Sequence, residues 1–101
     1  MNPLEKLLEQ EFDFRTSPTY PRHVITVKYQ FAALLEMTPE GRIKQFSSAG
    51  LLLESGEIAL LVERQGRAAF VYKAKEVAAE PEKLEHYQRF LQELRAVLEQ
   101  Q

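Results

Sequence analysis

Apolar and polar residues alternate along the middle of this chain, and a period of two predicts β-strands with one buried face. The clearest stretch covers residues 50–75, where apolar segments are separated by two short turns that each end in glycine. We interpret Arg64-Gln65-Gly66 as a three-residue loop whose glycine takes the left-handed conformation. This loop sets Glu63 opposite Arg67, and opposite charges across a ladder are mildly favourable.

The length of this loop decides which residues share a face of the sheet. With three loop residues, one apolar face collects Ile58, Leu60, Val62, Ala68, Phe70, Tyr72 and Ala74. A two-residue loop would instead place Arg64 opposite Arg67 and would scatter the apolar residues over both faces. We therefore expect the three-residue loop.

Two further loops of the same kind extend the predicted sheet. They are Pro39-Glu40-Gly41, with proline where a type I turn favours it, and Glu54-Ser55-Gly56. Since apolar positions are odd-numbered before Phe31 and even-numbered after it, a bulge or sharp bend is required near residues 31–33. The sequence thus predicts four strands, near 23–37, 42–54, 57–64 and 67–76, with Gly41, Gly56 and Gly66 at positive φ.

Helical patterns flank this sheet. Residues 1–12 start with Asn2-Pro3, a favourable helix start, and continue with a single apolar stripe. Residues 81–100 start with Pro81 and carry a stripe broad enough to cover a sheet face. Both segments are predicted to be helices.

The remaining segments complete one domain, 1–101. Pro18 and Pro21 predict an extended connector over 13–22, and residues 76–80 are expected to form a loop. We therefore expect an α+β fold in which a four-stranded antiparallel meander, residues 23–76, forms a curved sheet between a short N-terminal helix and a long C-terminal helix.

The segment FAALLEMTPEGRIKQFSSAGLL, residues 31–52, supports a second interpretation. It resembles a helix-turn-helix, and the hairpin that follows resembles the wing of a winged-helix DNA-binding domain. The resemblance extends to about Tyr72 and implies a recognition helix that starts at Thr38. It also implies that three side chains face base edges, those of Arg42, Lys44 and Gln45. A winged-helix or other nucleic-acid-binding regulator is therefore the alternative function.

Composition narrows the class of protein. The 101 residues are 45% hydrophobic and 28% charged, include no cysteine, and carry a net charge of −2 with a mildly basic middle between acidic ends. No apolar segment is long enough to span a membrane, and residues 1–12 lack the apolar core of a secretory signal. We expect a cytoplasmic protein without disulfides or thiol chemistry.

The sequence offers no motif for catalysis. His23 and His86 are the only histidines and lack the spacing of metal ligands. Ser47-Ser48 lacks the context of a nucleophile elbow, and there is no glycine-rich phosphate-binding pattern. We expect no enzymatic activity, no catalytic residues, no cofactor and no metal.

The second face of the predicted sheet has a small apolar centre with a charged rim. Its members are Ala59, Leu61, Glu63, Arg67, Ala69 and Val71. This arrangement is typical of a protein contact surface. The sequence therefore predicts a protein-binding, assembly or adaptor protein, which forms a homodimer and binds an unidentified protein but no membrane.

Overall fold

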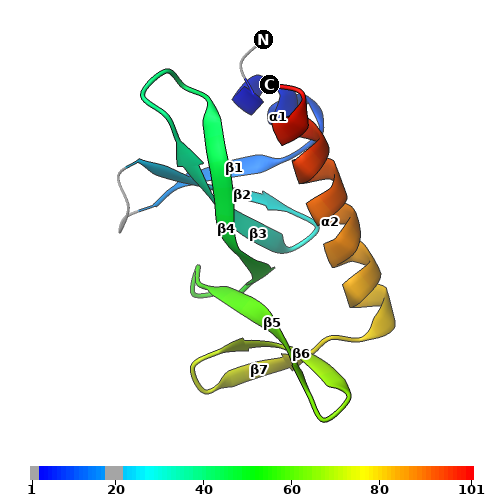
Figure 1. The fold of residues 1–101 in the computed structure, drawn as a ribbon. Helices are drawn as coiled ribbons and strands as arrows, with labels where there is room; N and C mark the ends of the chain where they lie inside the picture. Colours follow the sequence, from blue (N-terminus) through cyan, green and yellow to red (C-terminus); the bar gives the residue numbers. More distant parts are fainter. Residues whose placement is uncertain (1–2, 18–21) are drawn as a thin grey trace.

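The computed structural model describes residues 3–17 and 22–101, which form two helices and one seven-stranded sheet. Each strand pairs antiparallel with the next strand in the chain. The sheet curls into a half-barrel with α2 packed against its inner side (Figure 1). The elements are α1 (Pro3–Glu9), β1 (Asp13–Thr16), β2 (His23–Lys28), β3 (Phe31–Met37), β4 (Ile43–Leu52), β5 (Ile58–Arg64), β6 (Arg67–Tyr72), β7 (Lys75–Ala78) and α2 (Pro81–Glu99).

The expected four-stranded meander is wrong, because the sheet has seven strands. The expected strand 23–37 is in fact two strands, β2 and β3. The chain reverses at Tyr29 and Gln30, whose φ angles are 56° and 72°. This tight turn places Ile25 opposite Leu34, so the odd-numbered face of β2 continues as the even-numbered face of β3 without the expected bulge or bend. The core, however, takes Phe31, Ala33 and Leu35 of β3, so the even-numbered core face expected after Phe31 is wrong for this strand.

The other additional strands lie in segments that the sequence indicated only as connections. The start of the expected connector forms β1, which pairs with β2. Residues 18–21, which include both of its prolines, lie outside the described residues. The expected loop 76–80 contains most of β7, which pairs with β6. Both strands have four residues, too few for a clear alternation of apolar and polar positions.

The loop between β5 and β6 has two residues, which corrects the expected register. Arg64 pairs with Arg67, and Glu63 pairs with Ala68. Gln65 and Gly66 have φ angles of 52° and 76°, as a type I′ turn requires at its two central positions. Such a turn matches the twist of the flanking strands, and this outweighs the small penalty of two exposed like charges. The apolar residues of β5 and β6 are consequently divided between both faces.

The expected three-residue loops at 39–41 and 54–56 are confirmed. They place Met37 opposite Ile43 and Leu52 opposite Ile58. The three loop glycines have positive φ, with values of 85° at Gly41, 91° at Gly56 and 76° at Gly66.

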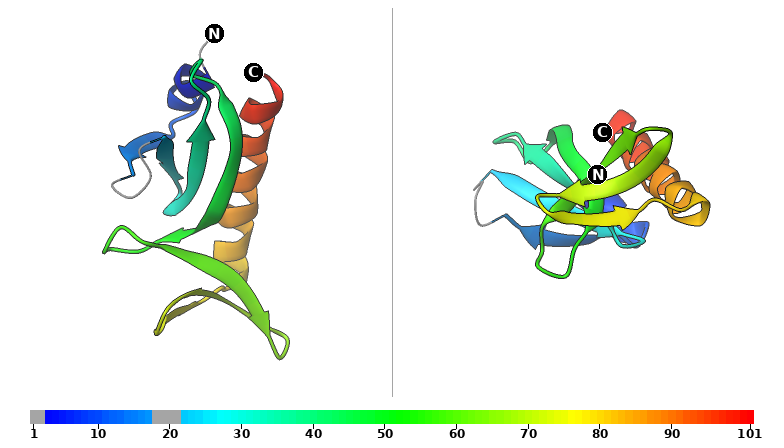
Figure 2. Two further views of the ribbon diagram at one scale, coloured as in Figure 1. Left: turned by 60° about the vertical axis from the view of Figure 1, so that its left-hand side comes forward. Right: turned by 90° about the horizontal axis from the view of Figure 1, so that it is seen from below.

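A bulge in β4 bends the sheet. The pairing of β3 with β4 shifts register between Ala32 and Leu34, and Ser48 on β4 has a φ of 50°. An extra residue of this kind bends a strand and increases its twist. Only Gly50–Leu52 of β4 pair with β5, so β5, β6 and β7 turn away from the first four strands and pass beneath the start of α2 (Figures 1 and 2).

The hydrophobic core lies between the sheet and α2. The ring centroid of Phe31 lies 5.6 Å from that of Phe70 and 5.1 Å from that of Tyr87. Phe90 adds a ring from the next turn of α2, and Phe12 packs against it at 5.8 Å. α2 therefore buries the apolar stripe expected from the sequence, with Tyr87, Phe90, Leu94 and Val97 as its buried residues.

Side chains from the C-terminal part of the chain bind the open edge of β4. Residues 43–49 of β4 have a strand partner only on the β3 side. The Tyr87 hydroxyl donates a hydrogen bond to the Ala49 carbonyl at 3.2 Å. The Ile43 N–H donates to Gln101 Oε1 at 2.8 Å, and the Gln101 amide donates to the Ile43 carbonyl. This edge is thus closed by side chains in place of another strand.

The structure does not form the recognition helix implied by the winged-helix resemblance. Residues 43–52 are strand β4, and residues 38–42 form the turn before it. Gly41 at positive φ would interrupt a helix at this position.

Candidate protein-binding surface

One face of β5, β6, β7 and the end of β4 is turned away from α2. The strand register places seven apolar residues on it. Among the described residues, the core cluster and the side chains packed against it include none of the seven, although Ala69 is buried at 9% exposure. In the view from below, β5 to β7 lie in front of the rest of the molecule (Figure 2). We refer to this surface as the outer patch; its apolar members are Leu52, Ile58, Leu60, Val62, Ala69, Val71 and Ala78.

The outer patch combines an exposed leucine with a shallow hollow. The Leu60 side chain is 46% exposed, the second largest exposure of any large hydrophobic residue in the described part of the chain. Val62, Ala69 and Val71 line a hollow of about 190 Å³ beside it. Leu60 and Ala78 are exposed, Ala69 is buried, and the other apolar members are half-buried. A partly exposed apolar surface with a hollow is a common feature of protein contact sites.

Charged side chains border this hollow at opposite ends. Arg64 and Arg67 lie directly across from each other at the β5–β6 turn, while Glu76 lies across from Val71 near the β6–β7 turn. All three line the hollow together with the apolar residues. Within residues 3–17 and 22–101, the side-chain ion pairs involve none of these three groups.

The structure separates the six residues that the sequence assigned to one interface. Arg67, Ala69 and Val71 lie on the outer patch face. Ala59, Leu61 and Glu63 lie on the inner face, where Ala59 is only 1% exposed and belongs to the core. Leu61 remains 37% exposed.

The interface predicted from the sequence lacks seven residues of the outer patch and its charged border, namely Leu52, Ile58, Leu60, Val62, Arg64, Glu76 and Ala78. A two-residue turn at Gln65-Gly66 would have placed Leu60, Val62 and Arg64 on the same face as Ala69 and Val71. Gln65-Gly66 has glycine at the second central position of a two-residue turn, where a type I′ hairpin prefers it.

The residues proposed for nucleic-acid contact lie elsewhere, beside an acidic side chain. Lys44 Nζ lies 3.5 Å from Glu36 Oε2, and Gln45 Nε2 donates a hydrogen bond to the same oxygen at 3.3 Å. Arg42 lies in the exposed turn before β4. Since Glu36 neutralises one of the two cations, this cluster is a poor phosphate-binding surface.

A partly buried polar cluster connects β2 to α2. Lys28, whose side chain is 11% exposed, places its Nζ 2.9 Å from Glu93 Oε2 and donates a hydrogen bond to the Gln10 carbonyl. Burial disfavours the Lys28 charge, but the hydrogen bond and ion pair with Glu93 outweigh it and raise the pKa of Lys28 above its ordinary 10.5. The Tyr29 hydroxyl donates to Glu93 Oε1 at 3.2 Å. This cluster fixes the β2–β3 turn on the helix.

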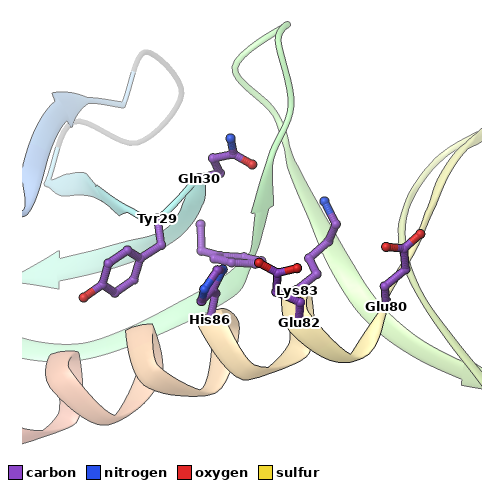
Figure 3. Close-up of a pocket in the computed structure, with 7 residues that line it drawn as sticks. Tyr29, Gln30, Glu80, Glu82, Lys83 and His86 are labelled. Carbon is purple, nitrogen blue, oxygen red and sulfur yellow. The ribbon is translucent and has the colours of Figure 1, made fainter.

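A pocket of about 420 Å³ lies between that turn and the start of α2 (Figure 3). Tyr29 and His86 form one wall, with ring centroids 6.1 Å apart and planes inclined by 28°. Lys83 projects between the two elements near Glu82, so the pocket carries charges of both signs. In the described ranges, no group of three or more acidic, histidine or cysteine side chains is placed to hold a metal ion.

No protein-family model, curated protein or solved structure matches this chain. Among the described residues, no helix is both long enough and apolar enough to cross a membrane.

Proposed function

We propose that this chain is a non-enzymatic protein–protein interaction domain that self-associates through the outer patch. The observation that carries the proposal is the position of Leu60, which is 46% exposed and shares a sheet face with Ile58, Val62 and Val71. Within residues 3–17 and 22–101, this face lies outside the core cluster that α2 covers. A role in assembly and a cytoplasmic location accompany this proposal as predictions.

A second copy of the chain is an economical cover for such a face. Two-fold symmetry pairs a surface with itself, so one apolar patch supplies both sides of the contact. Burial of exposed apolar area contributes about 25 cal/mol per Å², and Leu60 is the most exposed large side chain of the patch. The hollow lined by Val62, Ala69 and Val71 offers a place for a side chain of the other copy.

The size of the patch sets the expected affinity. The patch comprises the three residues Gly50–Leu52 and the seven, six and four residues of β5, β6 and β7. With strands about 4.8 Å apart and about 3.3 Å per residue, they cover about 300 Å². That is less than half of the ~800 Å² that each partner contributes to a stable interface of standard size. We therefore expect a weak dimer, with a dissociation constant in the micromolar range.

Two adjacent leucines provide a matched test. Leu60 and Leu61 are 46% and 37% exposed but point to opposite faces of β5. Sedimentation velocity across the micromolar range should show that Leu60→Arg is monomeric while Leu61→Arg still dimerises. Far-UV circular dichroism and thermal melts of both variants verify that each is folded. A monomeric unmodified protein at the highest concentration would overturn the proposal, as would an equal effect of the two substitutions.

A further inference from the structure

The outer patch carries opposite charges at its two ends. Arg64 and Arg67 stand at the β5–β6 turn, and Glu76 stands across from Val71 toward the β6–β7 turn. Val71 lies four positions after Arg67 on β6, which corresponds to about 13 Å along the strand. The apolar hollow lies between these ends.

We infer that two copies pack through the outer patch with antiparallel strands, so that Arg64 and Arg67 of each copy bind Glu76 of the partner subunit. This inference rests on the proposed self-association and adds its orientation. A two-fold axis in the plane of the interface and perpendicular to the strands reverses the strand direction. The basic end of one patch then lies over the acidic end of the other, twice in each dimer.

The alternative alignment is electrostatically unfavourable. An axis parallel to the strands would bring four arginines together at one end and two glutamates at the other, and like-charge juxtaposition works against association. Antiparallel alignment also supplies a counter-charge to the two arginines that face each other in the single chain. Arg64 and Arg67 are like charges directly across a ladder, and the ion pairs of the described residues leave both of them out.

The chemistry of the two groups suits this contact. A guanidinium presents a planar set of N–H donors that can bind a carboxylate with two parallel hydrogen bonds. The Glu76 carboxylate lies at the rim of the apolar area, where such pairs direct the orientation of partners more than they add affinity. The apolar residues would hold the copies together, and the charges would select the antiparallel alignment.

Charge reversal tests the alignment directly. One variant is Glu76→Arg, and the other combines Arg64→Glu with Arg67→Glu. In the antiparallel dimer each variant alone sets like charges against each other at both ends. We expect each variant to raise the dimer dissociation constant by at least about tenfold. An equimolar mixture restores both attractive contacts, so it should form a heterodimer with near-original affinity.

Sedimentation velocity with one variant carrying a fluorescent label measures homodimers and heterodimers separately. We expect the two charge variants to associate only when they are mixed. We also expect added salt to weaken the dimer of the unmodified protein. If Leu60→Arg abolishes dimerisation but both charge variants still form homodimers, the alignment is wrong and the proposed function stands. If the unmodified protein is monomeric throughout, the proposed function itself fails.

Discussion

The Lys28 ammonium lies 2.9 Å from the Glu93 carboxylate and ties the end of β2 to the middle of α2. Replacing Glu93 with Gln leaves a largely buried lysine charge without its acidic partner. We expect the free energy of unfolding to fall by about 1–3 kcal/mol, measured by urea denaturation. Glu85→Gln is the control, because Glu85 is exposed on the same helix. Equal stability of the two variants would show that the pair contributes nothing.

The stability of the protein should decline at alkaline pH. The pKa of Lys28 is raised above 10.5 by Glu93 despite opposing burial, and burial raises the pKa of the Tyr87 phenol above 10.0, with the nearby Arg95 charge partly opposing it. In both cases the folded state holds the proton more tightly than the unfolded state. The stabilisation is therefore complete below these ordinary values and is lost as the pH rises through the folded-state pKa values.

Urea denaturation from pH ~8 to pH ~11.5 measures this decline. Lys28→Met and Tyr87→Phe should each make the dependence of unfolding free energy on pH less steep, although both variants are less stable at neutral pH. If the unfolding free energy of either variant depends on pH as steeply as that of the unmodified protein, the substituted residue does not contribute to the decline.

Gly50 should tolerate no side chain. A Cβ at this position would lie 2.0 Å from the backbone oxygen of Ala59, so β4 and β5 would have to separate at their short junction. We expect Gly50→Ala to reduce stability by at least about 3 kcal/mol in thermal or urea denaturation. Gly56→Ala serves as the comparison. Its added Cβ meets no atom within 4 Å and introduces only the strain of a positive φ of 91°, which costs about 1 kcal/mol.

The turn at Tyr29 and Gln30 stores backbone strain that glycine would relieve. Both residues occupy the left-handed region, where a side chain is unfavourable. We expect Gln30→Gly to raise the unfolding free energy by about 0.5–1 kcal/mol, because type I′ turns favour glycine at the second central position. A lower melting temperature for this variant would contradict the two-residue turn between β2 and β3.

Sequence-specific binding to duplex DNA is not expected. Lys44 and Gln45 contact Glu36, and the recognition helix that would carry them is absent from the described residues. Titration of labelled duplex DNA at moderate salt, followed by fluorescence anisotropy, measures this. Submicromolar binding that weakens in Arg42→Ala or Lys44→Ala would contradict the prediction.

Two of the three loops and the long helix could be predicted from the sequence, whereas the register of β5 with β6 was predicted wrongly. Pro81 and the broad apolar stripe indicate α2 correctly, and the glycines at 41, 56 and 66 mark real turns. The register predicted at Arg64 is wrong because it favours the pairing of Glu63 with Arg67 over the pairing of two arginines. On an exposed hairpin those charges contribute only tenths of a kcal/mol, less than the match between turn and strand twist.

The position of the outer patch could not be predicted for the same reason. A change of one residue in the β5–β6 loop moves Leu60 and Val62 from the core face to the exposed face. The reversal at Tyr29 and Gln30 had no glycine, asparagine or aspartate to indicate it, so β2 and β3 were read as one strand.

The order of elements along the chain has a consequence for synthesis on the ribosome. Because each strand pairs with its predecessor, the seven strands can form hairpin by hairpin as they emerge. Phe31 and Phe70, however, are covered by rings of α2, which follows every strand. Until residues 81–99 have left the exit tunnel, the nascent sheet presents its aromatic inner face to water, so this interval is when the chain is most exposed to aggregation and most in need of chaperones.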